Sequence, residues 1–376
     1  MKGCVKMAEF NDNIGCFILA GGEGSRLKNL TKDRCKPLVK ICSHYHLIDF
    51  SLINCLRSGV LNIAVIVQYE AIDLIKYLFE SNMNSLMTTF NVLPPETKQT
   101  KKLDIVYKNT AHSVMVNLDY MNEEVIKDIL ILSADHVYSM DYNLFHQHHV
   151  DNDNDLTISV LDVSKEEASR FGVFTLDEND NIVNFEEKPE NPESTIVSMG
   201  VYMFKKEKLA EAFDALVDEI GYDLDFGKHV IPYFLKHFKV GVYKFKWYWL
   251  DLGTIDAFWN LNMRILDYPN FIKDFFVFDK RFKLERGAND ASPAFMADHS
   301  IVSSSLIGKN TFIEGNSKHS IIGDDVIIEN GANVINSVIM ESCVIKEGVT
   351  VKDAVISQNT IVEEDVISTG DEIICK

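Results

Sequence analysis

Residues 15–27 read GCFILAGGEGSRL, and this stretch decides the fold of the N-terminal part of the chain. The apolar run Gly15–Ala20 passes directly into Gly21 and Gly22. A run that is apolar on both faces is typical of a buried strand in a mostly parallel sheet. Ligands of such sheets bind beyond the carboxyl ends of the strands. The glycine-rich segment is therefore expected to border a binding site.

Similar apolar runs and helix-like stretches alternate along the rest of this region. Ile63–Val67 and Ile129–Leu132 are short continuous apolar runs, whereas Leu47–Ser58 and Glu70–Ser81 have helical spacing. Strands that alternate with helices in this way predict an α/β domain in three layers, with right-handed crossovers. We assign this domain to residues 1–265.

The C-terminal tail has a different period, of six residues. Gly, Asn, Asp and Ser fill the intervals, which is the hexapeptide pattern of a parallel β-helix and not the 3.6-residue period of an amphipathic helix. We predict a β-helix of about four coils over residues 299–376, joined to the first domain by a connecting segment over residues 266–298. The inward-facing positions are expected to be Ile301, Ile307, Ile313, Ile322, Ile328, Val334, Ile339, Ile345, Val351, Ile356 and Val362.

The composition of the chain argues against two classes of binding partner. The 376 residues carry 56 Asp and Glu against 37 Lys and Arg, a net charge of −19. This charge argues against nucleic acid and against an anionic membrane surface. The sequence has no apolar run of membrane-spanning length, and its first residues lead us to expect no signal peptide. Seven Cys without a CxxC pair indicate thiols in a reducing compartment, so we expect a cytoplasmic protein.

The glycine-rich segment Gly21–Leu27 fits a phosphate-binding loop. Glycine lets the backbone approach an anion, and Arg26 adds a cation. The segment is neither a Walker A loop nor a dinucleotide fingerprint, since Leu27 stands where the third Gly would be. Lys36 supplies a second cation nearby. The alternatives are a plain glycine turn and, for Lys36 with Arg34, a solvated face.

Two carboxylates and a lysine follow other predicted strands. Asp135 comes after the run ILILS, where it is placed to hold a hard cation, and Asp251 precedes a Gly turn. Each carboxylate has the alternative role of a helix cap. Lys188 is either a phosphate partner or one half of an ion pair. His136 is expected to be a structural histidine rather than a ligand, and a solvated helix face is expected for His146, His148 and His149.

Taken in order, the motifs of this chain resemble those of the nucleotide-sugar pyrophosphorylases and, within them, the glucose-1-phosphate adenylyltransferases. The resemblance covers nearly the whole chain. It implies a Rossmann-like nucleotidyltransferase domain followed by a left-handed β-helix. The motifs are GGEGSRL (21–27), CKP (35–37), IDF (48–50), SADHVYSMDY (133–142), EASRFGV (167–173), FEEKP (185–189), SMGVYMF (198–204), DFGKHVIP (225–232) and WLDLGTIDAFW (249–259).

The resemblance implies transfer of AMP from ATP to glucose 1-phosphate, which gives ADP-glucose and pyrophosphate for glycogen synthesis. On the nucleotide side, Gly21–Gly22 and Arg26 would hold the triphosphate and Lys36 would face its charge. Gln68 and Tyr107 would lie near the base. By the same resemblance, Arg26, Lys36 and Asp135 are the catalytic residues.

The metal and sugar sites also follow from the resemblance. Asp135 and Asp251 would hold Mg²⁺, the implied cofactor. Arg34 matches a position tied to anionic allosteric effectors, and the implied assembly is a homotetramer or a heterotetramer with a sister subunit. The implied glucose 1-phosphate residues are Gly172, Glu187, Lys188 and Ser198.

The chain departs from the family pattern at three places. The motif GGKYRxIDF becomes CSHYHLIDF over residues 42–50, GTAD becomes NTAH over residues 109–112, and Ala134 replaces a Gly. Asn109 is expected to keep a turn with positive φ. These changes leave two alternatives open, a pyrophosphorylase for another nucleotide sugar and a weakly active or regulatory subunit. A hexapeptide acyltransferase, with His299 or His319 as its base, is the alternative from another class.

Overall fold

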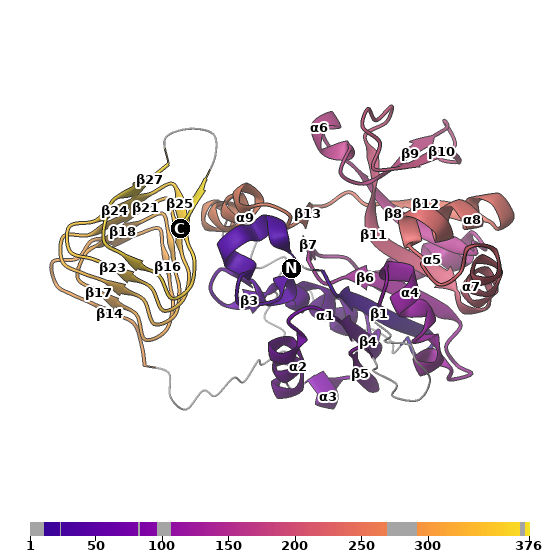
Figure 1. Ribbon diagram of the computed structural model, residues 1–376, viewed down its shortest axis with the longest axis horizontal. Helices are drawn as coiled ribbons and strands as arrows, with labels where there is room; N and C mark the ends of the chain where they lie inside the picture. The colour runs from indigo at the N-terminus through magenta and orange to yellow at the C-terminus, as the bar shows by residue number, and fades with distance from the viewer. Residues whose placement is uncertain (1–10, 23, 82, 96–106, 269–291, 369–372) are drawn as a thin grey trace, which may run out of the picture.

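The computed structural model describes residues 11–22, 24–81, 83–95, 107–268, 292–368 and 373–376. Cys4 and most of the predicted connecting segment lie outside the described residues. The described chain forms an α/β domain and a β-helix (Figure 1).

A nine-stranded mixed sheet forms the centre of the first domain. Its parallel part runs in the order β6-β1-β4-β5, so the three predicted strands are neighbours. These strands are β1 (Ile14–Ala20), β4 (Asn62–Val67), β5 (Thr89–Leu93) and β6 (Asp128–Ser133). The antiparallel part comprises β8 (Leu156–Asp162), β9 (Gly172–Leu176), β10 (Ile182–Glu187) and β11 (Ile196–Lys205), with β12 (Val240–Lys244) beside β8.

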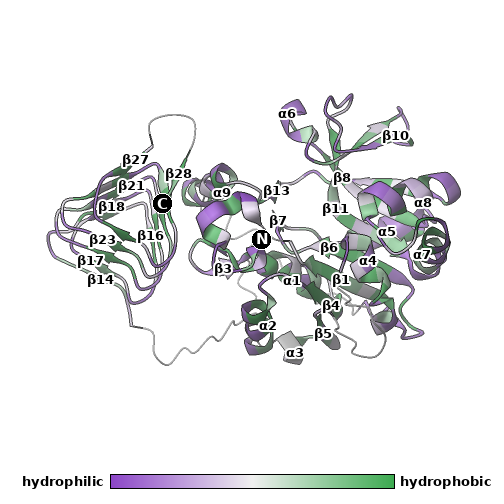
Figure 2. Ribbon diagram, in the orientation of Figure 1, coloured by the Kyte–Doolittle hydropathy of each residue, from purple (hydrophilic) through white to green (hydrophobic). Residues whose placement is uncertain are grey.

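Helices cover both faces of this sheet, which confirms the three-layer prediction. One face packs against α1 (Leu47–Arg57), α2 (Ala71–Glu80) and α5 (Tyr142–Asp151). The other packs against α4 (Thr110–Met115), α7 (Lys206–Ile220) and α8 (Ile231–His237). Apolar residues are green on the strands and on the inner sides of these helices in Figure 2. The shorter helices are η1 (Ser25–Thr31), η2 (Lys36–Leu38), α3 (Met83–Leu86), η3 (Leu118–Met121), α6 (Lys165–Ala168) and η4 (Phe226–Val230).

Two histidines of α5 are buried, contrary to the solvated face expected for them. His146 and His149 are 9% and 1% exposed, and both face the carboxylate of Asp128 at the start of β6. Burial works to raise the pKa of Asp128, but the hydrogen bond from His146 and the nearby imidazole of His149 lower it to about 2. A buried carboxylate needs polar partners such as these imidazoles. The sequence alone does not show that a carboxylate of the sheet, Asp128, faces these two histidines of α5.

The altered segment at residues 42–50 keeps a tight turn. β2 (Lys40–Ile41) and β3 (Tyr45–His46) form a hairpin, and Cys42 and Ser43 at its turn have φ of 52° and 56°. These are left-handed conformations that favour glycine. Residues that carry a Cβ therefore make the turn for which the resemblance implied two glycines.

The tail forms the predicted left-handed β-helix, with three parallel sheets of five strands each. The β14 sheet comprises β14 (Phe295–Met296), β17 (Phe312–Ile313), β20 (Ile327–Ile328), β23 (Val344–Ile345) and β26 (Ile361–Val362). The β15 sheet comprises β15 (Val302–Ser303), β18 (Asn316–Lys318), β21 (Asn333–Ile335), β24 (Thr350–Lys352) and β27 (Val366–Ile367). The β16 sheet comprises β16 (Leu306–Ile307), β19 (Ile321–Ile322), β22 (Val338–Ile339), β25 (Ala354–Ile356) and β28 (Ile374–Cys375).

The β-helix is longer than the sequence pattern indicated. Five strands in each sheet make five coils where about four were expected, because the first and last coils depart from the six-residue phase. Ile301 is 68% exposed, so its predicted inward position is wrong, whereas the positions from Ile313 to Val362 are buried as predicted. The first β-helix strand begins at Phe295, and α9 (Ile255–Asp267) is the last described helix before it.

The β16 sheet packs against the first domain. Ile321, Val338 and Val355 share one buried cluster with Phe258 and Leu261 of α9. Polar contacts border this cluster: the Trp259 indole donates to the Asn336 carbonyl at 2.8 Å, and His319 lies 2.9 Å from Asp267. Arg34 of the first domain pairs with Glu341 of the β-helix at 2.5 Å. Among the described residues, no helix is long and apolar enough to cross a membrane.

Candidate active site

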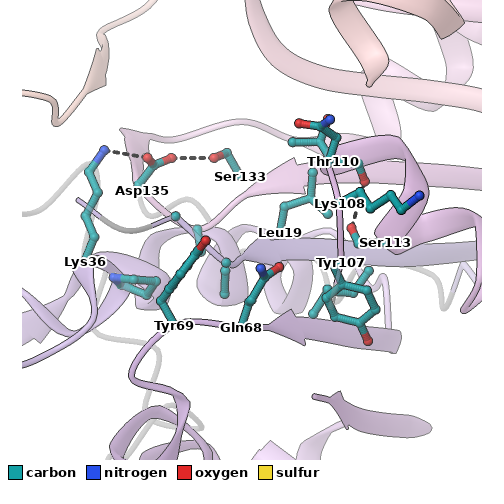
Figure 3. Close-up of a pocket in the computed structure, with 17 residues that line it drawn as sticks. Leu19, Lys36, Gln68, Tyr69, Tyr107, Lys108, Thr110, Ser113, Ser133 and Asp135 are labelled. Carbon is teal, nitrogen blue, oxygen red and sulfur yellow. Dashed lines mark hydrogen bonds and ion pairs between the residues drawn. The ribbon is translucent and has the colours of Figure 1, made fainter. Parts of the chain in front are cut away.

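A cavity of about 340 Å³ opens at the carboxyl ends of β1, β4 and β6. Six residues singled out from the sequence line it together, namely Gly21, Gly22, Lys36, Gln68, Tyr107 and Asp135. In Figure 3, Lys36 and Asp135 lie at one end of the cavity, Tyr107 and Thr110 at the other, and Gln68 between them. The position of the cavity agrees with the edge expected for a ligand of a parallel sheet.

The glycine-rich loop leaves space that side chains would fill. A Cβ on Gly21 would lie 3.3 Å from Cβ of Gln68. Gly24 has φ of 68°, and a Cβ there would lie 2.9 Å from Cβ of Lys36. Arg26 is exposed and makes no hydrogen bond or ion pair within the described chain. The loop thus brings its backbone to the cavity, and the Arg26 guanidinium lies near Gly253, two residues after Asp251.

Lys36 lies between the two predicted carboxylates. Its Nζ is 2.5 Å from Oδ2 of Asp135 and 3.4 Å from Oδ1 of Asp251. Burial works to lower the pKa of Lys36, but the two carboxylates raise it. Burial also opposes ionisation of Asp135, and Lys36 nevertheless holds the pKa of this carboxyl well below its usual range. Asp135 therefore stays ionised beside a charged ammonium.

Two short strands bring these carboxylates together. β7 (His136–Tyr138) and β13 (Trp249–Asp251) pair antiparallel, with Asp251 directly opposite His136. Ser133 donates a hydrogen bond to Asp135. The cap role considered for each carboxylate is not observed, because Asp135 precedes a strand and the side chain of Thr254 caps α9.

The same strands complete a set of three groups with metal-ligand chemistry. One side-chain atom each of Asp135, His136 and Asp251 lies within 4.8 Å of the others. Two carboxylates at this separation suit a hard divalent cation. The ammonium of Lys36 already stands where a cation contacts both of them, so the residues fit a metal ion.

Sequence reasoning missed two members of this cluster. His136 was expected to be structural, yet its Nε2 lies 3.4 Å from Asp135. Arg170 lies in the motif EASRFGV but was given no role, yet its guanidinium lies 3.4 Å from Asp251 and over the ring of Phe171. The available signal was its place in that motif, although its partner is distant in sequence.

The predicted sugar-side residues form a second cluster, outside the lining of the cavity. A Cβ on Gly172 would lie 3.0 Å from the Glu187 carboxylate, and Gly227 faces the same group, so only glycines leave room for it. Burial raises the pKa of Glu187. Ser198 is buried and donates to the Tyr202 hydroxyl at 3.1 Å. Lys188 is exposed, with Nζ 3.5 Å from Glu187.

The altered segment at residues 109–112 borders the cavity. Asn109 has φ of −149°, so the expected left-handed turn is absent and Asn109 instead begins α4 in extended conformation. His112 is buried and accepts a hydrogen bond from the Lys108 amide at 3.2 Å, and its burial lowers its pKa. The Tyr107 hydroxyl donates to the Pro94 carbonyl at 3.1 Å, which holds its ring in the wall of the cavity.

Comparisons with known proteins agree with this architecture. Residues 16–268 match the family model described as nucleotidyl transferase, and residues 292–372 match a GlmU-like C-terminal hexapeptide model. A glucose-1-phosphate adenylyltransferase of Lachnospira eligens is 37% identical over 318 residues, which cover 83% of this chain and 73% of that relative. The chain belongs to the glucose-1-phosphate adenylyltransferase family.

As a member of this family, the chain is a nucleotidyltransferase. This favours nucleotidyl transfer over the acyl transfer considered as the alternative from another class. The cavity lies wholly in the nucleotidyl transferase region. Acyl transfer by the β-helix is not favoured, because His319 is paired with Asp267 at the contact with α9.

Proposed function

We propose that the chain transfers AMP from ATP to glucose 1-phosphate, which gives ADP-glucose and pyrophosphate for α-glucan synthesis. The observation that carries the proposal is the cluster of Lys36, Asp135 and Asp251 beside Gly21–Gly22. The relative of known name supports this choice of substrates.

The proposed reaction requires little covalent chemistry from the side chains of the protein. An oxygen of the sugar phosphate attacks the α-phosphorus of ATP in line, and pyrophosphate leaves. The attacking phosphate is already ionised, so no general base is needed. Charge builds up on the leaving group, where Lys36 and Arg26 are placed to stabilise it. Lys188 orients the attacking phosphate, and Glu187 and Ser198 bind the glucose.

Mg²⁺ is the proposed cofactor. Asp135 and Asp251 would hold it, and His136 completes the group of side chains around it. When bound, the ion supplies positive charge to the phosphates of the nucleotide. With the ion in place, Lys36 would pair with the adjacent phosphates instead of the two carboxylates.

The proposed assembly is an oligomer, and Arg34 is the proposed contact for an anionic effector. In this structure Arg34 is 17% exposed and its partner is Glu341 of the β-helix. Lys40 lies 3.9 Å from the same carboxylate. An anionic effector would therefore compete with Glu341 for these two cations and act on the contact between the domains.

A pyrophosphate-release assay tests the activity. The purified chain is incubated with glucose 1-phosphate, Mg²⁺ and each nucleoside triphosphate in turn, and we expect release with ATP above the others. Release with another nucleotide would indicate a different nucleotide sugar. No release by the chain alone, but stimulation of a catalytic partner, would identify a regulatory subunit.

A further inference from the structure

Two segments that are distant in sequence meet at the side chain of Thr110. Its hydroxyl donates a hydrogen bond to Oδ2 of Asp225 at 3.0 Å and accepts one from the Phe226 amide at 3.3 Å. Thr110 and Asp225 are 115 residues apart in the chain, so only the fold brings them together. The first side chain of α4 is therefore bonded to both the N-cap and the first residue of η4.

Two further hydrogen bonds run beside this link. The side-chain amide of Asn109 donates to Asp223 at 2.5 Å, and the backbone amide of His112 donates to the Leu224 carbonyl at 3.0 Å. The first of these bonds lies at the surface, whereas Leu224 is fully buried in the core of the domain. The start of α4 is therefore held against residues 223–226 from the surface to the core.

The position of Thr110 points toward the nucleotide. Thr110 lines the cavity together with Tyr107 and Asn109. Figure 3 places Thr110 at the end of the cavity opposite Lys36, where Tyr107 is predicted to lie near the base. Position alone would make Thr110 a contact for the nucleotide.

The hydrogen bonds of Thr110 lead instead to η4. Asp225 uses its second carboxylate oxygen, Oδ1, to accept from the amides of Gly227 and Lys228 at 3.0 and 3.1 Å, and so caps the first turn of η4. Thr110 holds one oxygen of this carboxylate while the amides of η4 hold the other. The placement of the first turn of η4 therefore depends on the Thr110 hydroxyl.

The first turn of η4 forms part of the sugar-side cluster. A Cβ on Gly227 would lie 2.4 Å from Oε2 of Glu187, so the backbone of η4 approaches this carboxylate closely. The Phe226 ring lies 5.8 Å from the ring of Tyr202, whose hydroxyl accepts a hydrogen bond from Ser198. Both side chains proposed to bind glucose, Glu187 and Ser198, are therefore supported by η4 or by a residue packed on it.

We propose that Thr110 is a positioning residue for the glucose 1-phosphate site, although it lines the cavity on the nucleotide side. Its hydroxyl orients Asp225, Asp225 holds the first turn of η4, and Gly227 in that turn limits the space open to the Glu187 carboxylate. The inference rests on the proposed function, which supplies the identity of the sugar phosphate.

Removal of the hydroxyl tests this role. Thr110→Val keeps a side chain of similar shape but can neither donate to Asp225 nor accept from Phe226. We expect its KM for glucose 1-phosphate to rise about threefold to tenfold, which is the loss expected for one hydrogen bond, while its KM for ATP stays within about twofold of the wild-type value. Thr110→Ser is the conservative variant, because it restores the hydroxyl and should bring the KM for glucose 1-phosphate back toward the wild-type value.

Three kinetic results would overturn the proposal. A rise confined to the KM for ATP would make Thr110 a nucleotide contact, and equal rises for both substrates would make its role structural. A Thr110→Ser variant that behaves as Thr110→Val does would show that the hydroxyl is not the group that matters. Circular dichroism of both variants confirms that the chain is folded in each assay.

Hydrogen exchange in the chain without ligands tests the positioning separately from turnover. The amides of Phe226, Gly227 and Lys228 are bonded to Thr110 or to Asp225, so Thr110→Val should speed the exchange of residues 223–230 and leave that of β6 unchanged. Exchange of residues 223–230 at the wild-type rate would overturn the positioning role. A wild type that releases no pyrophosphate, together with faster exchange in the variant, would refute the proposed function and the sugar named here but not the link between Thr110 and η4.

Discussion

Lys36→Met is expected to tighten the binding of a divalent cation in the absence of nucleotide. The Lys36 ammonium lies 2.5 Å from Asp135 and 3.4 Å from Asp251, so it takes the place between the oxygens that a metal ion needs. A metal must therefore displace it. Methionine has a similar length and no charge, so the variant removes the ammonium from both carboxylates, whereas Arg170 stays beside Asp251 and Ser133 beside Asp135.

The size of the effect follows from the ion pairs that the metal breaks. A pair of unit charges 4 Å apart contributes about 4 kcal/mol at an effective dielectric constant of 20. In the wild type, metal binding breaks these ion pairs, and hydration of the displaced ammonium offsets part of the energy lost. The variant has no such ion pairs with residue 36, so metal binding to it does not carry this cost. We expect a net gain of about 1.4–2.8 kcal/mol for the variant, which is a tenfold to hundredfold lower Kd for the metal.

Mn²⁺ titration followed by electron paramagnetic resonance measures this affinity without turnover. Lys40→Met is the matched control, because Lys40 lies beside Asp324 and Glu341 at the domain contact and not at the metal cluster. We expect the control to bind as the wild type does. If Lys36→Met binds Mn²⁺ no more tightly than the wild type, Lys36 does not compete for the metal position. The same variant should turn over about 10²–10³ times more slowly, because the leaving group loses a cation.

Four further outcomes are expected. Asp135→Asn should abolish Mg²⁺-dependent pyrophosphate release and Mn²⁺ binding while circular dichroism stays unchanged; near-normal activity would contradict the metal assignment. Lys188→Ala should raise KM for glucose 1-phosphate much more than KM for ATP, and equal effects would make Lys188 structural. Burial works to raise the pKa of Glu341, but Lys40 and Arg34 lower it. The ion pairs of Glu341 therefore stabilise the fold above the ordinary glutamate pKa, and this stabilisation is lost as the pH falls. Glu341→Gln should lower Tm at pH 7 and should make Tm depend less on pH in the acid range. Ser43→Gly should raise stability by about 0.5 kcal/mol, measured by denaturant unfolding, because φ of 56° costs a residue with a Cβ; a lower stability would show that the serine conformation is unstrained.

Periodic features of the chain were predictable because they follow from local rules. The runs at Gly15–Ala20, Ile63–Val67 and Ile129–Leu132 are apolar on both faces, and only a buried strand satisfies such a run. The six-residue period likewise fixes the inward positions from Ile313 onward. The six-residue pattern fails in the first coil, which begins at Phe295 and leaves Ile301 exposed.

Features that depend on contacts distant in sequence were not predictable. His146 and His149 are buried because they face Asp128 across the contact between the helix and the sheet. The spacing of residues in the sequence does not predict this contact. Arg170 is 81 residues from Asp251 in sequence, and only the folded chain brings the two side chains to 3.4 Å. The function of a buried polar residue depends on the partner that the fold brings to it. The position of an apolar residue in the core follows largely from the repeat spacing of apolar residues in the sequence.

The candidate site reflects this difference. Gly21 and Gly22 follow from their place after β1, and Asp135 follows from its place after β6. The pairing of β7 with β13 then sets Asp251 opposite His136 and leaves Lys36 between the carboxylates, which no motif alone implies. Under the proposed Mg²⁺ assignment, this site would open only when phosphates give Lys36 another partner. The proposal therefore predicts that metal binding is coupled to nucleotide binding, and that the rise in Mn²⁺ affinity expected for Lys36→Met is smaller when the product ADP-glucose is bound.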